Sequence, residues 1–342
     1  MTLKNNLLTL VALFLAMLPV TAQEELINLE LQARVDYMHE QLDGRTIAPN
    51  SGFKGRFLNI YLTGRIDEHF SYSYRQRLNK EHLDRSFFDA TDWVYLTYAP
   101  SERWSFSAGK QVLHIGGWEY DRAPIDIHFY SEQNSQIACY QMGVSATHTF
   151  RGGRDRLTLQ VAESPFSVEN ENLYGLHLMW AGEHGALRTL YSVSAMEYAP
   201  NDYIWYVALG HRIELGNLLL ELDLTNRAGK DQGFLLRDCT ATAEAVWSLT
   251  DRFNVVGKVT YDVNRTHSAA NRIILPGTEL TRFGGGVEFY PLKTDRSLCI
   301  HANYCHTTGT NTNPDGVLQP KQGIVDIGIR WRMNLLRFTP KH

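Results

Sequence analysis

Residues 112–136 bring charged and aromatic side chains together in a stretch that Gly116, Gly117 and Pro124 prevent from forming a regular strand. A connection of about 25 residues is normally functional or disordered, and this one is too apolar for a mobile surface loop. Fixed charges on such a segment could sort solutes by charge at a narrow passage. The residues that would act there are Trp118, Glu119, Tyr120, Asp121, Arg122 and Asp126.

Catalytic and metal chemistry have weaker support. The chain contains no GxSxG, HExxH or GxGxxG motif. Gly143–Ser145 begins like GxSxG but lacks the second glycine of that motif. No pair of the four cysteines forms CxxC. His301 shares one face of an expected strand with Cys299 and Cys305, but His306 falls on the opposite face. We therefore expect no catalytic residue, no cofactor and no metal.

The elements that must position these residues are strands. Apolar and polar residues alternate along most of the chain, as in 29–37, 218–225, 253–263 and 325–333, which places them on opposite faces of a sheet. A helical period of 3.6 residues is nowhere sustained. We expect sixteen strands, at 29–39, 56–66, 69–78, 91–99, 103–111, 137–150, 155–163, 172–181, 186–196, 203–214, 218–227, 236–249, 252–263, 279–291, 297–308 and 323–334.

Short and long connections alternate between these strands. The longer ones are 40–55, 79–90, 112–136, 164–171, 197–202, 228–235, 264–278 and 309–322. Outer-membrane barrels have an even number of antiparallel strands, short periplasmic turns and longer loops outside. The sequence therefore predicts an all-β fold, a transmembrane antiparallel β-barrel of about sixteen strands whose third long connection folds inward as a constriction loop. The alternative for that connection is a loop packed over the outer mouth or at a subunit contact.

The composition agrees with such a barrel. The mean hydropathy is -0.29, a value that excludes a helical membrane protein but suits a barrel, in which only alternate residues face lipid. The formal net charge of -4 argues against a nucleic-acid binder. Residues 1–22 have Lys4, a short apolar core and a small-residue cleavage site, the organisation of a secretory signal peptide. We expect residues 23–342 to form the barrel domain.

Strand parity also predicts which charges face the lumen. Charged side chains cost little in a wet lumen, whereas on the lipid face at mid-bilayer they cost about 2–4 kcal/mol. The inward bases are Arg34, Arg65, Arg75, Arg77, Arg212, Arg227, Lys258, Arg282 and Arg330. The inward acids are Asp36, Glu214, Glu221, Asp223, Asp238, Glu244, Asp262, Glu288 and Asp326. The two signs balance, which predicts no strong anion selectivity.

Aromatic residues gather near the expected strand ends, where outer-membrane barrels carry interfacial girdles. The clusters are Trp93, Tyr95 and Tyr98 with Trp104 and Phe106, then Tyr203 and Trp205, then Phe289 and Tyr290. Ordinary strand preference for aromatics is the alternative explanation.

One segment resembles the phosphate-selective porin O and P family. It consists of the strand 93–98, a short turn and a second strand that ends at Gly109-Lys110. Ile115–Glu119 follows at the place where the family has a Pro-Phe-Gly-x-Glu tract, but the proline is missing here. The resemblance implies a sixteen-stranded channel that is trimeric and passes small anions.

We expect an outer-membrane porin of a Gram-negative bacterium, surrounded by outer-membrane lipid and passing small hydrophilic or anionic solutes by diffusion. A homotrimer is expected, and no nucleic acid. The alternatives are an outer-membrane barrel enzyme and a soluble secreted β-rich protein that binds glycans.

Overall fold

The computed structural model describes residues 26–79, 87–150, 152–167, 172–230, 232–293, 295–313 and 321–338. The expected signal peptide, residues 1–22, lies outside this part of the chain. All strands of the described residues belong to one antiparallel sheet of seventeen members, of which β2 (Arg45–Thr46) has two residues. The other sixteen confirm the strand number that the alternation predicted.

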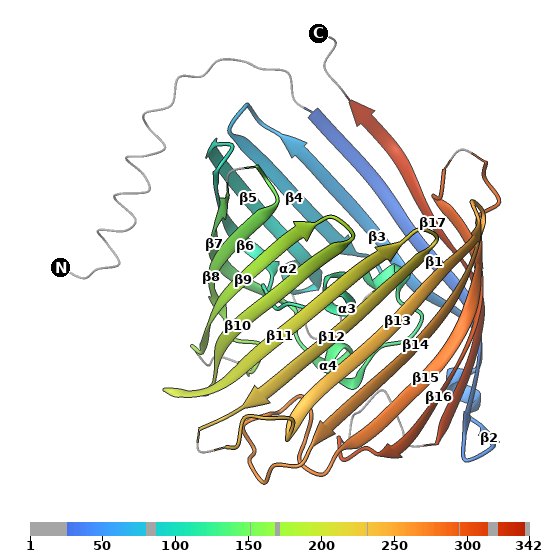
Figure 1. The fold of residues 1–342 in the computed structure, drawn as a ribbon. Helices are drawn as coiled ribbons and strands as arrows, with labels where there is room; N and C mark the ends of the chain where they lie inside the picture. Colours follow the sequence, from blue (N-terminus) through green and yellow to red (C-terminus); the bar gives the residue numbers. More distant parts are fainter. Residues whose placement is uncertain are drawn as a thin grey trace.

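The long strands follow each other along the chain. They are β1 (Leu26–Leu42), β3 (Gly52–Arg65), β4 (Phe70–Arg77), β5 (Thr91–Ser101), β6 (Trp104–Val112), β7 (Tyr140–Thr149), β8 (Asp155–Glu163), β9 (Tyr174–His184), β10 (Leu187–Ala199), β11 (Asp202–Leu215), β12 (Leu218–Ala228), β13 (Asp238–Thr250), β14 (Phe253–Asn264), β15 (Glu279–Phe289), β16 (Leu298–Thr310) and β17 (Gln322–Phe338). Each pairs with its neighbour in sequence, and β1 also pairs with β17, which closes the sheet into a barrel (Figure 1). Closure satisfies every strand edge, as a hydrocarbon environment requires.

The two faces of the wall differ as the alternation predicts. In β14, Val255 and Val259 are exposed on the outside, whereas Lys258 and Thr260 are buried on the inside. The start of β1 and the end of β17 lie at the rim that carries the short turns, and the longer connections lie at the other rim (Figure 1). One expectation is wrong. The connection at 197–202 was expected to be long, but it is a two-residue turn because β10 continues to Ala199 and β11 begins at Asp202.

Two of the predicted aromatic girdle clusters also contain residues that lie on the inner face of the barrel. Trp93 pairs in register with Arg75, and the Arg75 guanidinium lies 4.5 Å from the centre of its ring. Tyr95 has the same parity as Trp93, so both rings lie on the inner face of β5. Tyr290 is buried and donates a hydrogen bond to Glu288 on the inner face. Trp104, Phe106, Tyr203, Trp205 and Phe289 do point outward, where they are exposed.

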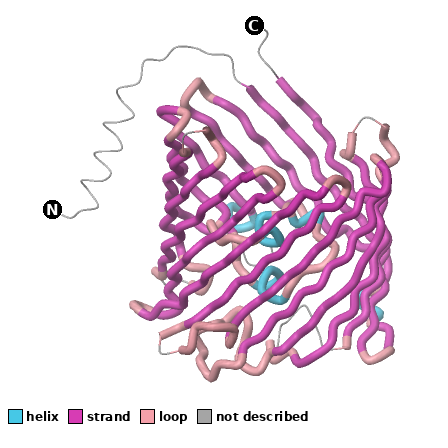
Figure 2. Tube along the Cα trace, viewed as in Figure 1, coloured by secondary structure: helices cyan, strands magenta, loops and turns pink. Residues whose placement is uncertain are grey.

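Helices are few and short. They are η1 (Ala48–Asn50), α2 (Phe87–Ala90), α3 (Trp118–Asp121), η2 (Pro124–Asp126) and α4 (Glu132–Gln136). Among the residues described, no helix is long and apolar enough to cross a membrane. The last three belong to the connection between β6 and β7, residues 113–139, which we call loop 3. Figure 2 shows these helices inside the barrel rather than above its rim.

Candidate functional site

Loop 3 leaves β6 through two glycines that let it lie directly against the wall. A Cβ on Gly116 would come within 2.6 Å of the Leu190 carbonyl oxygen of β10. Gly117 has a φ of 107°, which L side chains rarely adopt, and its Cα lies 2.8 Å from where a Cβ on Gly210 would be. The glycine pair therefore lets the backbone turn inward and touch β10 and β11.

The first helical turn of loop 3 is held by acids of the wall. Asp223 of β12 accepts hydrogen bonds from the backbone N–H groups of Trp118 and Glu119, both 2.8 Å long. Arg122, at the other end of the turn, donates to both Glu221 of β12 and Glu244 of β13. A carboxylate that accepts from N–H groups at the start of a helix forms strong, charge-assisted hydrogen bonds, and so does an arginine that donates to two carboxylates.

Arg212 and Lys258 complete this polar contact. Arg212 of β11 lies 3.8 Å from the centre of the Trp118 ring and 2.6 Å from the Glu221 carboxylate. Lys258 of β14 donates to Glu119 at 2.7 Å and lies 3.6 Å from the Glu244 carboxylate. Three acids and three bases therefore form one neutral network, made of Glu119, Glu221, Glu244, Arg122, Arg212 and Lys258.

The second half of loop 3 is held in the same way. Asp262 of β14 accepts from the backbone N–H groups of Glu132 and Gln133 at the start of α4. Arg227 of β12 donates to the Gln133 side chain at 2.9 Å. Ser131 caps α4 by accepting from the Asn134 N–H.

The tip around η2 reaches the other side of the barrel. Arg34 of β1 donates to the Ile127 carbonyl at 2.7 Å. Asp126 pairs with Arg330 and Arg332 of β17, and His128 lies 3.1 Å from the Glu288 carboxylate. Loop 3 is thus bonded to β1 and to the wall from β10 to β17.

An apolar cluster supports the ends of the loop. Leu113, Ile115 and Ile137 are buried against side chains of β10 and β11, including Met196 and Tyr206. Tyr120 packs against this cluster. Burial of such side chains contributes roughly 1.5–3 kcal/mol each, so the loop is a fixed part of the lumen.

A cavity of about 540 Å³ lies in the lumen beside loop 3. Its lining includes the bases Lys54, Arg56 and Arg282, the acids Glu40 and Asp326, and Phe129 and Tyr130 of loop 3. Burial raises the pKa of the Tyr130 hydroxyl to about 12, while the nearby charges of Arg56 and Arg77 act against this rise. Tyr130 therefore faces a basic wall.

On that wall, bases reach water while their acidic partners are buried. The Arg56 side chain is 38% exposed, whereas the Asp36 carboxylate it faces is 1% exposed and also holds Arg34. Arg77 is 25% exposed and shares Asp92, again 1% exposed, with Arg75. Asp92 thus neutralises only one of its two arginines, and at Asp36 the side chain that reaches water is the base Arg56, so the water-facing charge is positive.

The predicted inward residues differ in what they contact. The ones that bond directly to loop 3 are Arg34, Arg227, Lys258, Arg330, Glu221, Asp223, Glu244, Asp262 and Glu288. Arg75 and Arg77 belong to the basic wall, Arg282 lines the cavity, and Arg65 is exposed at the turn end of β3.

The predicted constriction residues act mainly as attachments. Trp118 and Glu119 are buried, and Arg122 and Asp126 are engaged in ion pairs. Asp121 is exposed.

Sequence reasoning missed Arg56 and Asp92 because both are the extra residues of β-bulges. The β1–β3 register passes from Phe57 to Gly55 and skips Arg56. The β4–β5 register passes from Trp93 to Thr91 and skips Asp92. A bulge breaks the two-residue period on which parity depends, so an interruption in the alternation was the available signal.

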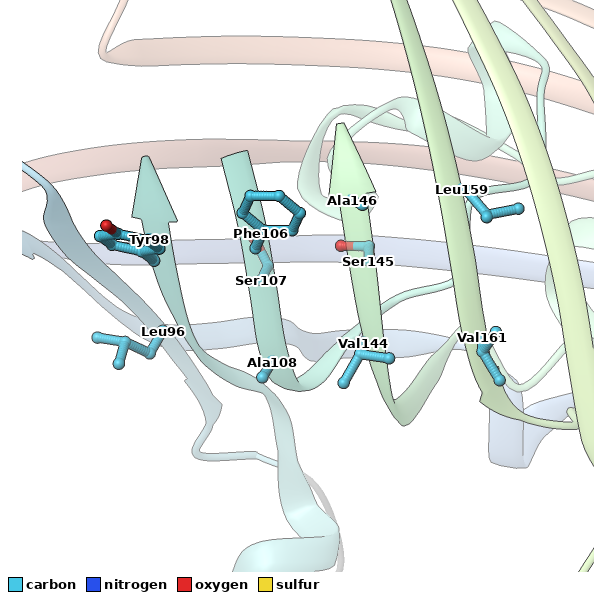
Figure 3. Close-up of a pocket in the computed structure, with 10 residues that line it drawn as sticks. All are labelled: Leu96, Tyr98, Phe106, Ser107, Ala108, Val144, Ser145, Ala146, Leu159 and Val161. Atoms are coloured by element: carbon cyan, nitrogen blue, oxygen red, sulfur yellow. The ribbon is translucent and has the colours of Figure 1, made fainter. Parts of the chain in front are cut away.

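The outside of the barrel offers an apolar hollow. It is formed by β5 to β8, with Ala108 and Ala146 at its floor and Tyr98, Phe106 and Leu159 among its larger lining residues (Figure 3). These side chains point away from loop 3, so the hollow is part of the outer surface and not of a solute path.

Comparisons with known proteins agree with this geometry. The sequence model described as Phosphate-selective porin O and P matches residues 27–209, more than half of the chain. The chain belongs to the phosphate-selective porin O and P family. This porin is therefore an outer-membrane channel protein, and the alternative of a soluble secreted β-protein is wrong. No curated sequence matches it.

Solved structures share the porin's fold at low identity. The anion-selective porin from Comamonas acidovorans has 11% identity and a TM-score of 0.64, over 91% of this chain and 100% of that one. The outer membrane channel DcaP of Acinetobacter baumannii has 10% identity and a TM-score of 0.64, over 91% and 97%. OmpT of Vibrio cholerae has 11% identity and a TM-score of 0.59, over 92% and 99%.

Proposed function

We propose that this porin conducts small anions by passive diffusion through the space between loop 3 and the basic wall. The observation that carries the proposal is the unequal exposure of the two signs of charge. Arg56 and Arg77 reach water, whereas their partners Asp36 and Asp92 are buried beneath them. Selectivity depends on the charges that face the solute at the narrow part of a pore.

The balanced count of inward charges predicted no strong anion selectivity. The greater solvent exposure of the arginines changes that expectation. Most inward acids are occupied in holding loop 3 and do not face the path. Arg282 adds a positive charge at the cavity: its guanidinium donates to Thr307 and Gln322, and it forms no ion pair with any described residue. Loop 3 then narrows the channel by its bulk, while the opposite wall supplies the charge.

Similar proteins support the same solute class. The family description names phosphate, and the Comamonas porin is described as anion-selective. We infer a small inorganic or organic anion as the solute, with phosphate as one member of that class.

We further infer the setting of the channel. Residues 1–22 would be cleaved during export, and residues 23–342 would form the barrel in the outer membrane of a Gram-negative bacterium. A homotrimer is supported by the solved trimer form of the Vibrio cholerae OmpT. Passive diffusion needs no catalytic group, so we propose a channel and not a barrel enzyme.

The test is the reversal potential of purified, heat-modifiable porin in planar bilayers under a KCl gradient. The wild type should be anion-selective, and the double variant Arg56→Glu/Arg77→Glu should shift toward cations. The matched control Arg103→Glu/Arg154→Glu makes the same charge change in two exposed turns and should shift the potential less. A cation-selective wild type, or equal shifts in the double variant and the control, would contradict the proposal.

A further inference from the structure

Three buried side chains converge where the barrel closes. Asp36 lies on β1, His301 on β16 and Asp326 on β17, each less than 5% exposed. The His301 Nε2 atom lies 3.2 Å from Asp36 Oδ1 and 3.4 Å from Asp326 Oδ1. Strand parity predicted that all three side chains face the lumen. It predicted neither that they lie close together nor any role for them.

The atoms that face one another have no hydrogen bonds, nor has His301 Nδ1, whereas the outer carboxylate oxygens are held. Asp36 Oδ1, His301 Nε2 and Asp326 Oδ1 are buried and form no hydrogen bond. The other carboxylate oxygens are occupied: Arg34 donates to Asp36 Oδ2 at 2.8 Å, and Asn303 donates to Asp326 Oδ2. Buried polar atoms are normally satisfied, so three such atoms pointing at one centre form a candidate ligand set.

A glycine makes the space for this arrangement. Gly328 of β17 pairs with Asp36 on one side and with His301 on the other. A Cβ on Gly328 would lie only 2.1 Å from Asp36 Oδ1. The absent side chain therefore lets the Asp36 carboxylate lie across β17 toward the imidazole.

We propose that Asp36, His301 and Asp326 bind a divalent transition-metal ion such as Zn²⁺. Zinc binds imidazole nitrogen and carboxylate oxygen at about 2.0–2.2 Å in tetrahedral geometry, which places two ligand atoms about 3.3–3.6 Å apart. The observed separations of 3.2 and 3.4 Å are close to that spacing. Arg34 and Asn303 supply the outer contacts that orient metal-binding carboxylates.

The site has a route to solvent. Asp326 lines the 540 Å³ cavity, so an ion could enter from the lumen and keep a water as its fourth ligand. The two carboxylates face two guanidiniums, Arg34 at 3.6 Å from Asp326 Oδ1 and Arg56 at 3.9 Å from Asp36 Oδ2, so the case for the ion rests on the converging ligand atoms and not on net charge. The competing occupant is a proton on His301, which would bridge the two carboxylates as an ion pair.

The ion would join the first strand of the barrel to the last two. Its binding should therefore raise the unfolding temperature, because a ligand that binds only the folded state stabilises it. This inference is independent of the proposed solute.

The experiment uses folded porin in detergent, treated with EDTA, desalted and incubated with Zn²⁺. After a second desalting step, elemental analysis should find one zinc per chain, and the unfolding temperature should rise. His301→Gln and Asp326→Asn should lose both effects. His306→Gln, on the opposite face of the same strand, should keep them.

A milder variant keeps the ligands intact. Asn303→Ala removes the contact to Asp326 Oδ2 and should weaken zinc binding about 10- to 100-fold. Heat modifiability checks the folding of every variant. No zinc retained by the wild type would overturn the proposal and favour the proton, and equal retention by His301→Gln would place the zinc elsewhere.

Discussion

Arg122 is the side chain whose removal best tests how loop 3 is held. Its guanidinium bridges Glu221 and Glu244, which are opposite each other on β12 and β13. Arg122→Met keeps a long side chain and removes the charge. The neutral network of three acids and three bases would then carry one uncompensated negative charge.

The size of the effect follows from what each glutamate retains. Removing one partner of a buried ion pair typically costs about 3–5 kcal/mol. Here Glu221 keeps Arg212 at 2.6 Å, and Glu244 keeps Lys258 at 3.6 Å. We therefore expect a loss of stability below that range, about 2–3 kcal/mol, which appears as release of loop 3.

Two measurements report that release. Urea unfolding of porin folded into lipid vesicles gives the loss of stability, and planar-bilayer recording should show larger current fluctuations in the open channel. The matched control is Arg265→Met, which removes an exposed arginine paired with the exposed Glu279. An exposed ion pair contributes little, so this variant should behave like the wild type.

A rescue separates lost charge balance from lost packing. The double variant Arg122→Met/Glu244→Gln removes the one negative charge that the single variant leaves uncompensated and keeps the Arg212–Glu221 and Lys258–Glu119 pairs, so it should recover much of the stability. The reasoning fails if Arg122→Met is no more destabilised than Arg265→Met. It also fails if the double variant is as unstable as the single one.

Three further predictions concern loop 3 and the wall. Burial raises the pKa of Glu132 from 4.5 to about 7, so the free energy of unfolding should fall by up to about 3 kcal/mol as the pH rises between these values. Glu132→Gln should abolish this pH dependence of urea unfolding. An unchanged pH dependence would exclude Glu132 as its source. Gly109 has a φ of 130°, and an added Cβ would lie 2.3 Å from the Val94 carbonyl, so Gly109→Ala should lower the heat-modification temperature, whereas Gly257→Ala, with open space around it, should not. Deleting 117–126 should raise single-channel conductance, and unchanged conductance in folded protein would show that loop 3 does not narrow the path.

The barrel and the direction of its side chains follow from the local pattern of the chain. A two-residue period is a local property of the backbone, so alternation alone gave the strand number and placed residues such as Lys258 and Asp262 inside. The glycine pair and the aromatic residues of 112–136 were likewise enough to predict that this segment folds inward.

Which charges remain available to a solute depends instead on contacts between distant parts of the chain. Parity gives the side of a wall, but it says nothing about which residue of another strand or loop lies opposite. Glu119 and Glu244 became attachments of loop 3 because register and loop path brought Arg122 and Lys258 to them.

The residues that decide the channel's charge are those at which the local pattern breaks. Arg56 and Asp92 sit in bulges, where an extra residue changes the direction of the side chain relative to its neighbours. Asp36, His301 and Asp326 meet because three strands are paired in one register across the closing seam. Such contacts depend on residues far apart in the chain, and a local period contains no information about them.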